Sequence, residues 1–113
     1  MKREIVERKL MEAGIPARTM GLDMLVDAVM MQEDSQWKNA KWGAVLFNIG
    51  QRHGKTACNV ERNMRYALDA ARKYFPHRAK EWFGIYKGTA HSVMWFWRVM
   101  KDEECKNQVA DAE

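Results

Sequence analysis

A group of polar and basic side chains in the middle of the 113-residue chain has types and spacing suited to binding nucleic acid. Arg62 and Arg65 carry guanidinium groups that can pair bidentately with guanine, and Asn59 carries an amide suited to adenine. Lys55 and the backbone N–H groups that follow Thr56 suit a phosphate, because the first N–H groups of a helix have no intrahelical partner. These residue types predict a surface that contacts both the bases and the phosphate backbone of a nucleic acid.

The distribution of charge supports a polyanionic partner. The chain has a net charge of +4, but residues 41–80 carry nine Lys and Arg against two Asp and Glu. The flanking segments are weakly acidic, with net charges of −1 for residues 1–40 and −2 for residues 81–113. A basic block of this kind favours nucleic acid, and the alternative is a solvated helix face on which cations cluster by chance.

The elements that must position these residues are all helices, because apolar residues recur at helical spacing and no alternating strand pattern occurs. The sequence predicts an all-α fold of six helices. The first helix is expected to end at about Ala13, the second to follow Gly21, and the last to begin at about Ala90–Ser92. The three helices between them are expected at about Asn39 to Arg52, Ala57 to about Tyr74 and about Arg78 to Phe83.

The third and fourth predicted helices form a helix-turn-helix at about residues 39–74. Gly50 supplies the small residue that a close approach needs, and Gly54 supplies a residue that tolerates positive φ in the turn. Thr56 is a good N-cap, and Val60 offers an apolar contact back onto the first helix. The second helix would then lie in the major groove with its N-terminal residues at base edges.

The chain is expected to be one domain at residues 1–104, followed by a polar, frayed tail at 105–113. Its longest apolar run, Val93 to Trp97, is far short of a membrane helix, and its start does not resemble a signal peptide. Two cysteines do not make a disulfide scaffold. We therefore expect a soluble, cytoplasmic protein.

Neither catalysis nor metal binding is expected. His53 and Cys58 are close in sequence, but no third orienting group is evident beside them. The remaining His and Cys residues do not have the spacing of metal ligands, and no cofactor motif occurs. Eight of the twelve aromatic residues lie from Tyr74 onward, which indicates either a second small core or a surface for a partner.

Two motifs resemble those of one family. Residues 14–29, GIPARTMGLDMLVDAV, resemble the stretch G-[VI]-P-A-H-x-x-G-x-x-Y-L-R-E-A-I, and residues 55–67, KTACNVERNMRYA, resemble T-T-A-S-R-V-E-R-A-I-R-H-A. Both belong to the C-terminal DNA-binding effector domain of the sporulation-initiation response regulator, stage 0 sporulation protein A. The resemblance covers about residues 4–104 and implies a six-helix DNA-binding domain.

The resemblance and the residue chemistry together give a set of expected contacts. Base edges would be read by Asn59, Glu61, Arg62 and Arg65, and phosphates would be held by Lys55, Thr56, Arg18 and Arg72. The chain departs from the family at three of these positions, with Asn59 in place of Arg, Arg18 in place of His and Lys55 in place of Thr. The family's DNA sequence is therefore not expected to transfer unchanged.

These features predict a sequence-specific transcription regulator that binds double-stranded DNA. The alternative is an interaction module of the same fold that antagonises a homologous regulator or RNA polymerase without reading bases. A homodimer, tandem binding on DNA and a contact with RNA polymerase stay open as partners. Family members carry an N-terminal receiver domain, for which this chain has no segment; an excised domain and a free-standing relative both stay open.

Overall fold

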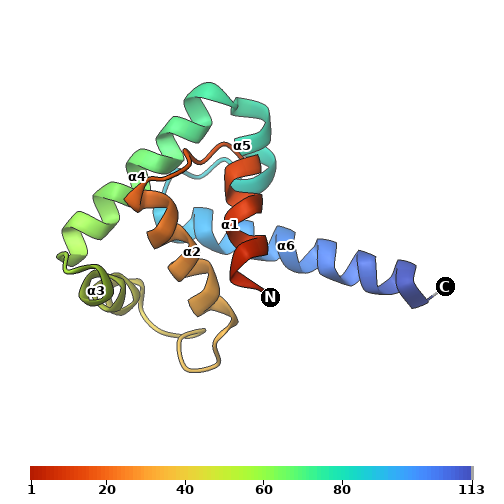
Figure 1. The fold of residues 1–113 in the computed structure, drawn as a ribbon, viewed down its shortest axis with the longest axis horizontal. Coiled ribbons are helices and arrows are strands. Elements are labelled where there is room, and N and C mark those ends of the chain that lie inside the picture. The colour runs from red at the N-terminus through yellow and green to blue at the C-terminus, as the bar shows by residue number, and fades with distance from the viewer. Residues whose placement is uncertain (113) are drawn as a thin grey trace.

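The computed structural model describes the backbone of residues 1–112 and the side chains of residues 1–106. Within the described residues the chain forms six helices and no strand, which confirms the predicted all-α fold (Figure 1). The helices are α1 (Arg3–Glu12), α2 (Met20–Glu33), α3 (Trp42–His53), α4 (Ala57–Tyr74), α5 (Pro76–Phe83) and α6 (Thr89–Ala112).

Helix α2 is the centre of the fold, because it packs against α1, α3, α4 and α6. Most of its side chains are buried, including Leu22, Met24, Leu25, Ala28 and Val29, and they join one core. A helix that is apolar nearly all round is typical of a position between other helices.

Helices α3 and α4 meet across the predicted short turn. Gly54 ends α3 in the left-handed conformation with φ of 67°, and its backbone N–H donates to the Gly50 carbonyl. A Cβ on Gly50 would lie 2.4 Å from the Lys55 carbonyl oxygen, so only glycine fits. The predicted close approach is confirmed, but the neighbour of Gly50 is the backbone of the turn. The two glycines hold the start of α4 against α3.

Helix α6 starts inside the fold and then extends away from it, as Figure 1 shows. Phe96 is fully buried and stacks on Phe83 of α5, while Trp82 also packs against Phe96. Phe83 and Phe96 belong to the same hydrophobic core as the buried residues of the other helices, so these contacts do not form the separate second core that the clustered aromatic residues indicated. Other aromatic residues of this region, among them Tyr86 and Trp95, are exposed.

Some helix boundaries differ from the predicted ones. Helix α3 begins at Trp42 and not at Asn39, because the preceding residues form a turn in which the Gln36 N–H donates to the Asp34 carboxylate. Helix α5 begins at Pro76, whose missing N–H costs nothing in a first turn. The tail predicted at 105–113 falls mostly outside the residues whose side chains are described, so that division stays a prediction.

Candidate nucleic-acid interface

The first turns of α4 carry the predicted contacts for bases and phosphate. The Thr56 hydroxyl accepts a hydrogen bond from the Asn59 N–H at 3.1 Å, so Thr56 is the predicted N-cap. Lys55, Thr56, Arg62 and Arg65 are all exposed. The structure therefore places three cations and a helix N-terminus on one exposed stretch of the helix-turn-helix, where negative charge is favoured.

Asn59 is half-buried and held by a neighbour on the same helix. Its side-chain oxygen accepts from Asn63 Nδ2 at 2.7 Å, and its backbone carbonyl accepts from the same nitrogen at 2.9 Å. This pair fixes the orientation of the Asn59 amide and leaves its nitrogen as the group that can donate. The spacing of four residues was visible in the sequence, but the pairing was not predicted.

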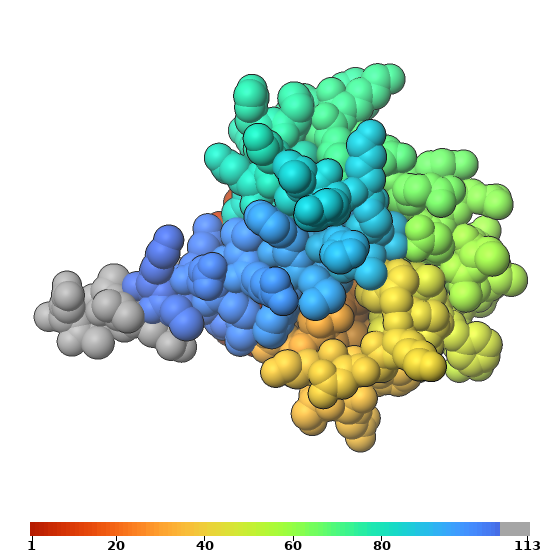
Figure 2. All heavy atoms as spheres, turned by 180° about the vertical axis from the view of Figure 1, so that it is seen from behind, coloured from red at the N-terminus to blue at the C-terminus, as the bar shows by residue number. Residues whose placement is uncertain are grey.

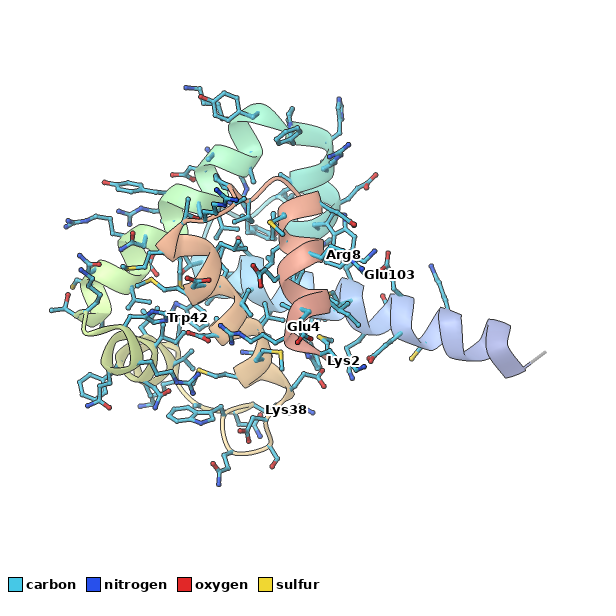
Figure 3. The ribbon with its side chains drawn as sticks, viewed as in Figure 1. Lys2, Glu4, Arg8, Lys38, Trp42 and Glu103 are labelled. Atoms are coloured by element: carbon cyan, nitrogen blue, oxygen red, sulfur yellow. The ribbon has the colours of Figure 1, made fainter. Side chains whose placement is uncertain are left out.

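Glu61 links α4 to the start of α6. The Thr89 hydroxyl donates to Glu61 Oε2 at 2.5 Å, and the indole N–H of Trp42 donates to the Thr89 oxygen at 3.1 Å. Arg65 Nη1 lies 3.9 Å from Glu61 Oε1. The carboxylate thus joins α3, α4 and α6 (Figure 3 labels Trp42) and orients Arg65. Sequence reasoning assigned Glu61 to base edges and missed this structural role.

Arg72 is engaged within the fold. Its Nη2 donates to the Tyr86 carbonyl at 3.0 Å and to the Ser92 hydroxyl at 2.9 Å. Its Nη1 is buried without a hydrogen-bond partner among the described residues, and burial lowers the pKa of the guanidinium. Arg72 therefore holds the segment between α5 and α6 against α4, which differs from the phosphate contact expected for it.

Arg18 lies in the connection before α2, exposed and at a positive φ of 58°. It immediately precedes Thr19, the N-cap of α2, and Gly21 of that helix packs against the backbone of Asn63. This packing places the α1–α2 connection beside α4. The structure thus brings Arg18 to the side of the expected interface, whereas Arg72 lies near the opposite end of α4.

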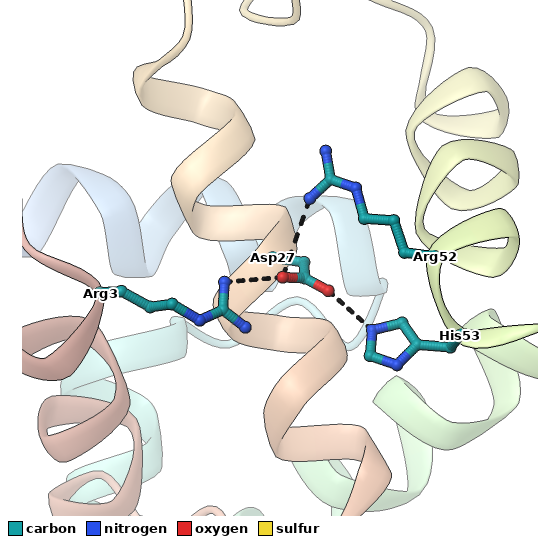
Figure 4. Close-up of polar contacts among 4 residues, drawn as sticks. All are labelled: Arg3, Asp27, Arg52 and His53. Atoms are coloured by element: carbon teal, nitrogen blue, oxygen red, sulfur yellow. Dashed lines mark hydrogen bonds and ion pairs between the residues drawn. The ribbon is translucent and has the colours of Figure 1, made fainter.

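A buried carboxylate on α2 contacts the end of α3 and so supports the helix-turn-helix. Asp27 of α2 is only 5% exposed and contacts cationic side chains from two other helices (Figure 4). Arg3 Nη1 donates to Oδ1 at 2.7 Å, His53 Nε2 lies 2.7 Å from Oδ2, and Arg52 Nη1 lies 3.8 Å from Oδ1. This Asp27 cluster ties α1 and the end of α3 to α2. Nothing in the sequence pattern marked Asp27 as buried.

Metal sites and membrane-spanning helices are both absent from the described part of the chain. No group of three or more His, Cys, Asp and Glu side chains there could hold a metal ion. No helix there is long and apolar enough to cross a membrane.

Comparison with known proteins agrees with the geometry. No curated protein and no solved structure matches the chain. Residues 6–108 match the family described as "Sporulation initiation factor Spo0A C terminal", a family of DNA-binding, non-enzymatic transcription effector domains. The match covers most of the chain and includes α2 to α5 completely, with the helix-turn-helix, and parts of α1 and α6. The chain belongs to the Spo0A C-terminal effector domain family.

Proposed function

We propose that this protein is a sequence-specific transcription regulator that binds double-stranded DNA, with α4 as its recognition helix. The observation that carries the proposal is the exposed, basic start of α4, held rigidly by the turn glycines and by the Asp27 cluster. A recognition helix enters the major groove with its N-terminal turns, which here carry Asn59 and Arg62. The family membership supports the same assignment.

The proposed contacts divide into two kinds. Arg62 and Asn59 read base edges, and Arg65, oriented by Glu61, lies one turn further along the helix. Lys55, Arg18 and the N–H groups after Thr56 contact phosphates on either side of the groove. Glu61 acts through Arg65 and Thr89, and Arg72 acts by holding the α5–α6 segment.

Selection of bound sequences from a random duplex library tests the proposal. The wild-type chain should enrich a defined motif, and Arg62→Ala should weaken binding to it by about 1–3 kcal/mol and relax preference at one base pair. Arg8→Ala, an exposed arginine on α1, is the matched control and should leave the motif unchanged. An unchanged motif with Arg62→Ala would exclude α4 as the reading helix.

Asn59 gives a sharper test, because it stands where the family usually has Arg. Asn59→Arg should shift preference toward guanine at one position, by about 1–3 kcal/mol for a good bidentate pair. Asn63→Ala, which frees the Asn59 amide without adding charge, should broaden the preference at that same position. Identical motifs from all three proteins would remove Asn59 from the set of reading residues.

A second candidate function is favoured by the exposed apolar residues at and just before α6. Ile85 and Tyr86 are 65% and 64% exposed, and Trp95 is 44% exposed. Exposed apolar groups of this size are typical of a surface for a protein partner, such as a second copy or RNA polymerase. Enrichment of no motif by the wild-type chain, with retained binding to a homologous regulator, would favour this candidate.

A further inference from the structure

A basic groove runs along α4 from Arg65 to Lys73 and so begins within the turns proposed to read bases. It is lined by Arg65, Asp69, Arg72, Lys73 and Lys87 and has a volume of about 470 Å³. Four of these residues are cations and only Asp69 is acidic. The first four come from successive turns of α4, and Lys87 comes from the segment between α5 and α6.

The position of Lys87 depends on Arg72. Arg72 donates to the carbonyl of Tyr86 and to the Ser92 hydroxyl, so it fixes the backbone next to Lys87 against α4. In Figure 2 the α5–α6 segment, in cyan, lies beside the green helix α4. The side chains of Lys73 and Lys87 thereby border one groove from two different elements.

The dimensions of the helix and of DNA suggest what the groove contacts. Helix α4 has 18 residues and is therefore about 27 Å long, whereas the major groove is about 12 Å wide. A helix that inserts its first turns must leave the groove over one sugar–phosphate strand. Arg65 belongs both to the reading turns and to the basic groove, so the groove begins where that strand would pass.

We propose that the groove between α4 and Lys87 is a second phosphate site, which binds the DNA backbone flanking the base pairs read by Arg62. The inference rests on the proposed DNA-binding function and extends it to a new set of residues. Lys73 and Lys87 contact the phosphates directly, and Arg72 is a positioning residue that holds Lys87 in place. Asp69 opposes binding, since its carboxylate lies among the cations.

The salt dependence of duplex binding tests this site. Each lost phosphate contact should make the slope of log affinity against log salt shallower by about one. We therefore expect that change for Lys73→Ala and for Lys87→Ala, with the selected base motif unchanged. Lys2→Ala, an exposed lysine beside α1 and distant from α4 in Figure 3, should leave the slope as in the wild type. Asp69→Asn should raise affinity for all sequences alike.

Two further arms separate the outcomes. Inorganic phosphate and tripolyphosphate are titrated into the protein while the backbone amide signal of Lys87 is monitored. This titration distinguishes a site for free phosphate from a site for the DNA backbone. Saturation by free phosphate together with unchanged DNA slopes in both lysine variants overturns the proposal. The wild type could select no motif while both lysine variants still show a shallower salt dependence of duplex binding than the wild type. That result would support the phosphate site in the groove and contradict sequence-specific recognition.

Discussion

Helix α2 is attached to the two sides of the molecule through two acidic side chains, and the two attachments differ. On the side of α3, Asp27 is almost fully buried, forms ion pairs with Arg3 and Arg52, and contacts His53. On the side of α6, Glu33 is less buried and accepts from the indole N–H of Trp97 at 2.6 Å and from Lys101 at 3.3 Å. The helix-turn-helix is thus anchored by a buried charge, and α6 by aromatic and exposed polar groups.

The packing on the two sides follows the same contrast. The α3 side uses glycine, whose missing Cβ lets backbones approach within a distance that no side chain permits. The α6 side uses large aromatic side chains, several of them half-buried, which tolerate small displacements better. The surface proposed to read DNA is therefore built for a single geometry, while the other side is built for contact area.

Removing the buried carboxylate should have the largest effect. Asp27→Asn leaves its cationic partners without a charge partner, and loss of one member of a buried pair costs about 3–5 kcal/mol. Because Arg3 and Arg52 are about half exposed and can turn to water, we expect about 3 kcal/mol in urea unfolding. Asp23→Asn, at an exposed position on the same helix, is the control and should cost under about 1 kcal/mol. Equal losses from the two variants would contradict the anchoring role of Asp27.

A methyl group at the turn should have the next largest effect. Gly50→Ala places a Cβ against the Lys55 carbonyl, and the strain of overpacking, about 1–3 kcal/mol, exceeds the gain of about 1 kcal/mol in helix propensity. DNA affinity should fall further than stability, because the start of α4 must move. Gly43→Ala, in the same helix with open space around it, should be neutral or stabilising by thermal unfolding. A stabilised Gly50→Ala would mean that the turn is not tightly packed.

The contact between the two sides can be weakened at Thr89. Thr89→Val removes the hydroxyl that joins Trp42 to Glu61 and leaves two half-buried polar groups without this partner, which should cost about 1–2 kcal/mol. Arg65, no longer oriented through Glu61, should contribute less to DNA affinity. Thr89→Ser keeps the hydroxyl and should behave as the wild type in both stability and binding. Loss of affinity with Thr89→Ser would point to the methyl group instead.

The α6 attachment should give the smallest effect, and one that depends on pH. Burial raises the pKa of Glu33, but hydrogen bonds from Trp97 and Lys101 outweigh it, so the folded pKa lies below 4.5. Stability from this group is present above the unfolded pKa and is lost as pH falls through the folded pKa. Glu33→Gln should therefore cost under about 1 kcal/mol near pH 7, and this difference from the wild type should shrink in acid, as pH falls through the folded pKa.

The control for this measurement is Glu104→Gln, which alters only the exposed side of the Lys101 pair. Its stability difference from the wild type should be near zero at both pH values. A Glu33→Gln difference that stays constant with pH would show that packing, and not charge, accounts for the attachment.

Much of the candidate site could be predicted from short-range pattern. The exposed cations Lys55, Arg62 and Arg65 and the Thr56 cap follow from residue type and helical spacing, which neighbours in sequence determine. The engagement of Glu61 and Arg72 could not be predicted in this way, because their partners Thr89 and Tyr86 lie 28 and 14 residues away. An exposed-looking charge on a helix face does not reveal what a later segment will place against it.

The helices, the turn between α3 and α4 and the family could be predicted from the sequence, since periodicity, glycine and capping act over a few residues. The central position of α2, the burial of Asp27 and the shared groove of Lys73 and Lys87 depend on how distant segments pack together. Burial of a charge is favourable only where cations from distant segments converge on it, and that convergence is a property of the packed chain.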